Sequence, residues 1–283
     1  MDFEEKAQKE AKKHEQESQQ FTVWLDEARE KNENYFETVS RIMPIFSEFM
    51  QGCSHRKTFL ALLAFHTHLS TLKNALIDLS ETGNIYSMKV LYRVFLEHWL
   101  KGTYIWTRYI EEDTDDVGNE YNSIGKIGEG LKYGNSVKQV SIILDAEAKD
   151  LDVWDTLCEY DPKLKELNKK DIINNIKKFE YKNIAKYLAD HDAPGGKWVS
   201  IVIPEYAELS SFVHGGPDAS EEYSQKLYDK RFEEYKGMVR FSFNMCRAYA
   251  YSIFMLMLKN VDEEKKKELL PLLYKLRDEK GMV

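Results

Sequence analysis

The stretch from 85 to 110 carries a charged pair and a histidine among mostly apolar residues. Arg93 and Glu97 are four positions apart and share one face of an α-helix, and His98 follows directly. Because the neighbours are largely aliphatic and aromatic, we expect the pair to be partly buried, where a charge must be paired or hydrogen-bonded. Two interpretations stay open. The pair either holds helices in register, or it lines a polar pocket that binds or cleaves a ligand.

A second group of chemically capable side chains lies far along the chain. Tyr206, Ser210 and His214 follow one another at four-residue intervals, so they line one face of a short helix. His214 would lie at the helix C-terminus, where the helix dipole favours its protonated form. No G-x-S-x-G nucleophile elbow is present, which argues against a hydrolase triad. His214 either caps its helix beside the Arg93 and Glu97 neighbourhood or takes part in a site.

Other residues complete the candidate site. Tyr92 and Tyr206 offer aromatic rings on which bases can stack, and Arg247 interrupts the apolar segment 241–258. We therefore predict Arg93, Glu97, His98 and His214 as catalytic residues, and Tyr92, Tyr206, Ser210 and Arg247 as ligand-binding residues.

We expect neither a metal nor another cofactor. His66 and His68 are two positions apart and point to different helix faces, and no H-E-x-x-H motif is present. The stretch GKIGEGLKYG resembles a phosphate-binding loop only superficially, since it lacks the Gly-Lys-Ser/Thr ending.

The elements that must position these residues are helices, because no useful alternating strand pattern occurs. Apolar residues recur every three or four positions in most of the chain. The expected helical segments are 1–31, 33–51, 55–81, 85–110, 136–160, 162–190, 203–213, 221–260 and 262–279. Gly83-Asn84 ends one helix and the next resumes at once, which predicts an antiparallel helical hairpin at the centre of the fold.

The remaining stretches and the domain division follow from composition. Five glycines between 118 and 134, after an acidic turn, predict a flexible loop or a broken helical stretch over 111–135. Sparse apolar positions before Phe21 predict a charged helical arm at 1–32, followed by one domain at 33–283. The predicted fold is all-α, a helical bundle with a central antiparallel hairpin and additional helices.

Net charge, cysteine content and apolar segments limit the partners and the cellular location that we expect. The chain has 283 residues and a formal net charge of −8, so global charge attracts neither nucleic acid nor an anionic membrane. Three widely separated cysteines and a polar N-terminal stretch favour a cytoplasmic protein without a disulfide framework. The segment 241–258 approaches membrane-spanning length, but Arg247 and Asn244 inside it favour a core helix, so we expect no membrane partner.

Two segments resemble a known group of proteins. "SMKVLYRVFLEHWLKGTYI" resembles the Arg-x-x-x-Glu helix of uncharacterised bacterial helical proteins, and "YAELSSFVHGG" resembles their Tyr-x-x-x-Ser-x-x-x-His segment. These families of unknown function look distantly like HEPN and abortive-infection proteins, which are all-helical. HEPN ribonucleases carry an arginine followed four to six residues later by a histidine, and Arg93 and His98 fit that spacing, although Val94 replaces a usually polar residue.

The resemblance implies a role in phage defence or stress, with binding of nucleic acid or a nucleotide and metal-independent RNA cleavage. In that mechanism His98 or His214 is the base for the 2′-hydroxyl and Arg93 is the cation for the phosphate. It also implies a homo-oligomer and an operon partner. The alternative is a non-enzymatic effector or scaffold that acts through self-assembly, or, more remotely, through a membrane-active segment at 241–258.

Overall fold

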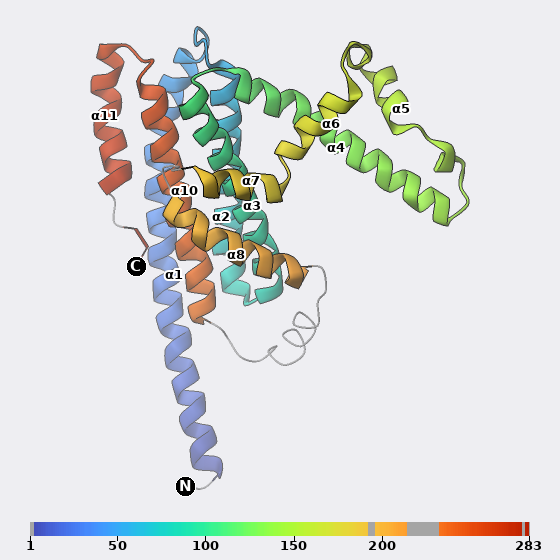
Figure 1. Ribbon diagram of the computed structural model, residues 1–283. Helices are drawn as coiled ribbons and strands as arrows, with labels where there is room; N and C mark the ends of the chain where they lie inside the picture. The colour runs from blue at the N-terminus through green and yellow to red at the C-terminus, as the bar shows by residue number, and fades with distance from the viewer. Residues whose placement is uncertain (1–2, 192–195, 214–231, 279–280, 283) are drawn as a thin grey trace. The chain divides into compact units, whose positions relative to one another are not determined.

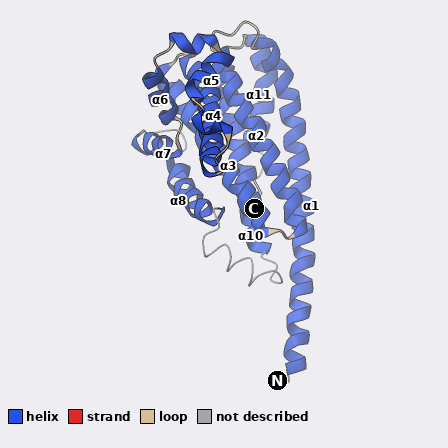
Figure 2. Cartoon of the chain, turned by 90° about the vertical axis from the view of Figure 1, so that its right-hand side faces the viewer, coloured by secondary structure: helices blue, strands red, loops and turns tan. Residues whose placement is uncertain are grey.

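The computed structural model describes residues 3–191, 196–213, 232–278 and 281–282. All regular structure in these ranges is α-helix or short 3₁₀ helix, and Figure 2 shows no strand in the part of the chain that is described. The prediction of an all-α helical bundle is therefore confirmed.

Contacts between residues divide the chain into two compact units. Unit 1 comprises 1–53, 62–102 and 200–283, and unit 2 comprises 54–61 and 103–199. The predicted division into an arm at 1–32 and one domain at 33–283 stays a prediction, because these units are groups of contacts rather than independently folding domains.

Unit 1 is built from long helices. They are α1 (Phe3–Phe49), α10 (Phe232–Leu258) and α11 (Glu263–Asp278), with most of α2 (Arg56–Thr82), α3 (Ile85–Glu112) and α8 (Gly196–Val213). In Figure 1, α1, α10 and α11 pack against one another. The core consists of aromatic and aliphatic side chains that are almost fully buried: Tyr35, Ile42, Phe46, Leu62, Leu69, Leu76, Met88, Phe95, Leu96, Phe243, Ile253 and Phe254.

The predicted hairpin of α2 and α3 is confirmed. Gly83 adopts a positive φ of 68°, which a side chain would strain, and so ends α2. The Asn84 side chain accepts a hydrogen bond from the backbone N–H of Ser87 at 3.0 Å, which helps to start α3. Tyr235 of α10 donates to the Gly83 carbonyl at 2.8 Å. The turn is therefore fixed both locally and by the core.

The N-terminal region forms one helix where we expected two. α1 runs for 47 residues through the expected break near Asn32. No glycine or proline stands at that point, so nothing in the backbone stops the helix. Phe21, Leu25 and Ala28 are buried in unit 1, whereas residues 8–17 are exposed.

Unit 2 contains α4 (Asp116–Ile143) and several shorter helices. These are 3₁₀ turns at Glu147–Asp150 and Pro162–Glu166, α5 (Val153–Tyr160), α6 (Lys169–Lys178) and α7 (Tyr181–Asp190). α4 packs against the first 3₁₀ turn, α5 and α6. Several short helices therefore replace the two long helical segments expected over 136–160 and 162–190.

The glycine-rich stretch is helical, so the prediction of a loop or broken helix over 111–135 is wrong. Four of its glycines are packing positions: Gly118, Gly128, Gly130 and Gly134. A Cβ atom on Gly118 would lie 2.2 Å from the backbone nitrogen of Thr58, and one on Gly134 would lie 2.4 Å from a methyl group of Val153. The absence of a side chain at these positions lets neighbouring segments approach α4 closely.

The first residues of two further helices differ from those expected. α8 begins at Gly196 rather than at 203 and contains Pro204. The described part of the long helix expected over 221–260 begins at Phe232, and its first residues lie outside the described ranges.

The apolar segment 241–258 lies within α10 and supplies core residues such as Phe243 and Phe254. None of the described helices combines the length and the apolar character that crossing a bilayer requires.

Candidate functional site

Helix α3 carries a row of charged side chains at four-residue intervals. Lys89, Arg93, Glu97 and Lys101 follow one another along the helix at the spacing that brings side chains together. The side chains of Arg93, Glu97 and Lys101 are 19%, 27% and 30% exposed, respectively. Most other side chains of α3 pack in the core, so this row forms the polar face of the helix.

Helix α8 supplies the facing side chains, and Figure 1 shows it beside α3. Val199, Val202, Tyr206 and Leu209 recur at intervals of three and four and are buried. Ser210 follows Tyr206 by one helical turn and is half-buried. Apolar packing of α8 therefore sets the position of both polar groups.

Arg93 joins the two helices. Its Nε donates to the Ser210 hydroxyl at 3.1 Å, and its Nη2 donates to the Tyr206 hydroxyl at 2.9 Å. The guanidinium carbon also lies 4.9 Å from the centre of the Tyr206 ring. Segments that are more than a hundred positions apart thus meet at one guanidinium group, as the candidate site requires.

Glu97 completes the cluster. It accepts from Arg93 Nη1 at 3.4 Å, from Lys101 Nζ at 2.7 Å and from the Tyr206 hydroxyl at 3.5 Å. We call the five residues Arg93, Glu97, Lys101, Tyr206 and Ser210 the Arg93 centre.

The electrostatics of the Arg93 centre fix its protonation near neutral pH. Burial acts to raise the pKa of Glu97, but the hydrogen bond and charge of Lys101, together with Arg93 and His98, outweigh burial and hold that pKa below its usual value. Burial and the Glu97 charge raise the pKa of Tyr206. Glu97 is therefore an anion and Tyr206 a neutral hydrogen-bond donor.

The centre has unused capacity to bind an anion. Arg93 has five N–H donors, and three of them are directed at described residues. Arg93 and Lys101 contribute two positive charges against the single carboxylate of Glu97. A partly exposed guanidinium held from several sides can bind a phosphate or carboxylate group.

His98 does not join these contacts. Its Nδ1 lies 2.8 Å from the Val94 carbonyl oxygen, and its ring centre lies 5.1 Å from that of His68. Because a carbonyl only accepts, Nδ1 carries the proton in the neutral ring and Nε2 is left unprotonated. Burial, more than any other effect, lowers the pKa of His98, so the neutral form with a basic Nε2 is favoured.

Tyr92 is 2% exposed and so presents no free ring for a base. Burial and the neighbouring Glu205 raise the pKa of its hydroxyl, while burial also raises the pKa of Glu205. Tyr92 thus supports the packing of α3 against α8 from within.

Arg247 lies on α10 and contacts the end of α11. Its Nη1 donates to the carbonyl oxygens of Leu276 and Arg277 at 3.5 and 3.3 Å. These carbonyls belong to the last turn of the helix, where a cation is favoured. No contact of Arg247 with the Arg93 centre is found among the described residues.

His214, the second predicted catalytic histidine, lies outside the described residues.

Lys101 was not among the predicted site residues, although it contributes the shortest contact to Glu97. The signal was available, since Lys101 follows Glu97 by four positions, the spacing already used for Arg93 and Glu97. Lys89 extends the same row and pairs with Glu234 of α10 at 2.9 Å.

Among the described residues, no three or more His, Cys, Asp or Glu side chains are arranged so that they could hold a metal ion. Comparisons of the chain with protein-family models, with curated proteins and with solved structures give no match.

Proposed function

We propose that the Arg93 centre binds a phosphate group of RNA or of a nucleotide. The observation that carries this proposal is the fixed, partly exposed guanidinium of Arg93, held by Ser210, Tyr206 and Glu97. Because the protein already orders this side chain, a ligand that binds it incurs little further loss of side-chain entropy. Lys101 adds a second cation beside it.

The more specific hypothesis is metal-independent cleavage of RNA. A base removes the proton of a 2′-hydroxyl, the 2′-oxygen attacks phosphorus, the bond to the 5′-oxygen breaks, and the 5′-oxygen takes up a proton. Arg93 stabilises the charge on the non-bridging oxygens. This route forms a cyclic phosphate and needs a histidine close to Arg93.

The two histidines differ as candidates for the base. His98 has a basic Nε2 but follows Arg93 by five positions, which corresponds to a rotation of about 140° around the helix axis. His98 could therefore act on a phosphate at the Arg93 centre only from another copy of the chain, as the resemblance to HEPN proteins implies. His214 follows Ser210 by four positions in the sequence and is the alternative base.

Fluorescence anisotropy with a short labelled single-stranded RNA tests the binding. Arg93→Gln should weaken binding by about tenfold or more, which corresponds to at least roughly 1.4 kcal/mol. Arg41→Gln is the matched control, because Arg41 is an exposed arginine on α1 outside the centre, and it should bind as the wild type does. Equal affinity for the wild type and Arg93→Gln, with both folded by circular dichroism, would refute the proposal.

Cleavage is tested separately with labelled RNA in the presence of a chelator. The hypothesis predicts cyclic-phosphate products that disappear in Arg93→Gln and in one of His98→Ala or His214→Ala. RNA that binds but stays intact would refute cleavage and leave binding standing.

A second candidate function is self-assembly as a scaffold, and one observation favours it. The exposed residues 8–17 of α1 extend the helix with little packing in unit 1. Light scattering of the full chain and of a chain lacking residues 1–12 tests this function while sparing the buried Phe21 and Leu25. A monomer in both cases would rule it out.

A further inference from the structure

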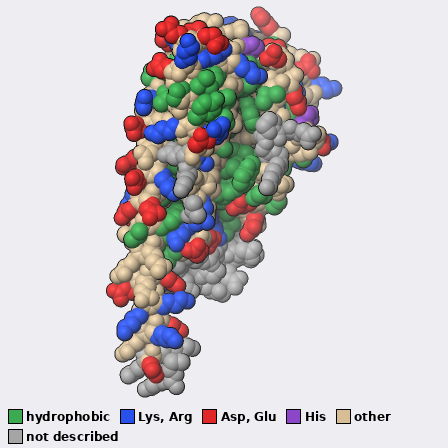
Figure 3. Space-filling view, turned by 90° about the vertical axis from the view of Figure 1, so that its left-hand side faces the viewer, with side chains coloured by type: hydrophobic (Ala, Val, Ile, Leu, Met, Phe, Trp, Pro, Cys, Tyr) green, Lys and Arg blue, Asp and Glu red, His purple; other side chains and the backbone are tan. Residues whose placement is uncertain are grey.

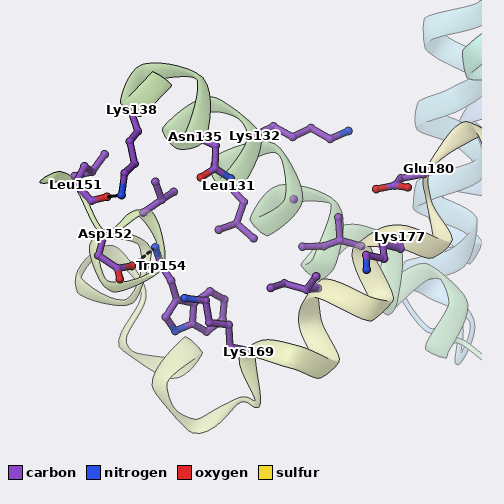
Figure 4. Close-up of a pocket in the computed structure, with 14 residues that line it drawn as sticks. Leu131, Lys132, Asn135, Lys138, Leu151, Asp152, Trp154, Lys169, Lys177 and Glu180 are labelled. Atoms are coloured by element: carbon purple, nitrogen blue, oxygen red, sulfur yellow. Dashed lines mark hydrogen bonds between the residues drawn. The ribbon is translucent and has the colours of Figure 1, made fainter. Parts of the chain in front are cut away.

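Unit 2 contains a cavity of about 430 Å³ between α4, α5 and α6, shown in Figure 4. Its volume lies within the range typical of small-molecule sites. Gly130 and Gly134 let α5 approach α4, and Gly128 contributes no side chain to the cavity wall. The glycine pattern of α4 therefore shapes a partly open cavity within this unit.

Part of the inner surface of the cavity is apolar, and the rest is polar. The apolar part is lined by the aliphatic residues Leu131, Leu151, Val153, Ile173 and Ile176. The Trp154 side chain of α5 is half-buried and lies across the cavity from Leu131 in Figure 4. A flat aromatic group could therefore pack against an indole ring and aliphatic side chains at once.

The rim is basic. Lys132, Lys138, Lys169 and Lys177 line the cavity, against the two carboxylates of Asp152 and Glu180. Asp152 is already engaged, because it caps α5 by accepting from the backbone N–H groups of Trp154 at 2.9 Å and Asp155 at 3.1 Å. The local charge is therefore positive in a chain whose net charge is −8.

The four lysines are held to different degrees. Lys138 donates to the Leu151 carbonyl oxygen at 2.9 Å, and the Lys169 ammonium lies 5.6 Å from the centre of the Trp154 ring. The ammonium groups of Lys132 and Lys177 make no hydrogen bond or ion pair with another described residue. Two cations are thus fixed beside the apolar wall, and two are available to a ligand.

We infer that this cavity binds a nucleoside 5′-phosphate, with the base against Trp154 and the phosphate on the lysine rim. An inorganic anion would leave the apolar wall without a partner, and an uncharged nucleoside would leave the lysines without one. The inference goes beyond the proposed function, because all the residues involved lie in unit 2 and none belongs to the Arg93 centre.

Isothermal titration calorimetry of the full chain with AMP tests the inference, with adenosine, ribose 5-phosphate and inorganic phosphate as comparison ligands. AMP should bind, and each comparison ligand should bind at least about tenfold more weakly, because each lacks one half of the recognition. No binding of AMP, or equal binding of inorganic phosphate, would overturn the inference.

Substitutions of the rim lysines test whether AMP binds in the unit 2 cavity. Lys132→Gln combined with Lys177→Gln should weaken AMP binding by about tenfold or more, and both side chains are exposed, so the fold should be retained. Lys163→Gln combined with Lys165→Gln removes the same charge from exposed positions outside the cavity and should leave the affinity unchanged. Equal losses in the two double variants would show a nonspecific charge effect and overturn the site.

Arg93→Gln separates the two proposals. It should reduce RNA binding and leave AMP binding intact, so either proposal can fail while the other stands. Loss of AMP binding in folded Arg93→Gln would place the nucleotide at the Arg93 centre and overturn the inference for the unit 2 cavity.

Discussion

Two cationic side chains of unit 1, Arg93 and Lys73, differ in their exposure and in their hydrogen bonding. Arg93 is partly exposed and hydrogen-bonded on several sides, whereas Lys73 has 0% exposure and its Nζ makes no hydrogen bond with a described residue. Lys73 is surrounded by aromatic rings, with its Nζ 4.0 Å from the ring centre of Tyr35 and 5.5 Å from that of Phe243. The rings compensate only part of the cost of burying the charge.

Replacing Lys73 with methionine should stabilise the protein at pH 7. Burial lowers the pKa of Lys73 from 10.5 to about 8, which corresponds to a cost of roughly 3 kcal/mol for the charged form. Methionine is also unbranched and is one atom shorter than lysine, but it loses the contacts of the cation with the rings. We expect the free energy of unfolding to rise by about 1–3 kcal/mol in urea titrations.

The free-energy cost of burying the Lys73 charge should depend on pH. The folded-state pKa lies below the unfolded one, so the cost is fully present below pH 8 and declines as the pH rises from about 8 to 10.5. The advantage of Lys73→Met over the wild type should therefore shrink between pH 7 and pH 10. Lys12→Met, at an exposed position on α1, should show no such change. A Met variant that is less stable at pH 7 would contradict this account.

At the scale of elements, α4 shows why one part of the fold escaped prediction. Glycine serves both as a breaker and as a site of close helix packing, and the sequence does not distinguish these roles. At Gly83 the turn interpretation was correct, because an apolar helical pattern stops there and resumes at once. In α4, Gly118, Gly130 and Gly134 instead face Thr58, Leu157 and Val153, respectively, which come from segments that the sequence does not place.

A pair of glycine substitutions tests this explanation. Gly118→Ala should destabilise the protein by about 1–3 kcal/mol, because the new Cβ would lie 2.2 Å from the Thr58 backbone, which cannot rotate away. Gly125→Ala meets nothing closer than 4.0 Å and should stabilise α4 by about 0.5–1 kcal/mol. Thermal unfolding measures both. Equal effects of the two substitutions would refute the packing role of Gly118.

The candidate sites were predictable to different degrees. Four-residue spacing placed Arg93 with Glu97 and Tyr206 with Ser210, because helical periodicity fixes which side chains share a face. Burial of Tyr92 and the contact of Arg247 with α11 depend on tertiary packing, which spacing does not describe. The unit 2 cavity could not be foreseen either, since its lining comes from three helices whose packing depends on the glycines of α4.

At the scale of the whole molecule, the charge distribution favours RNA binding through a few contacts over binding along an extended basic surface. The net charge is −8, and Figure 3 shows basic and acidic side chains interspersed over the face that it draws. Such a surface gives no long-range attraction for a polyanion. Affinity for RNA must therefore come from a few contacts with specific groups.

The salt dependence of RNA binding measures how many contacts there are. If Arg93 and Lys101 are the two cations involved, the slope of log K against log salt concentration should be about −1.4 for single-stranded RNA. Lys101→Gln should reduce the magnitude of this slope by about 0.7. A slope several times steeper would indicate a broad basic surface and contradict binding at this centre.

The central claim is that a phosphate group contacts Arg93, and the most direct measurement is the NMR signal of the Arg93 Nε–H group. Its assignment follows from its absence in Arg93→Lys. We expect this signal to shift when single-stranded RNA is added and to stay in place with a peptide nucleic acid of the same sequence, which has no phosphates. RNA that binds while the Arg93 signal stays unchanged would contradict the account.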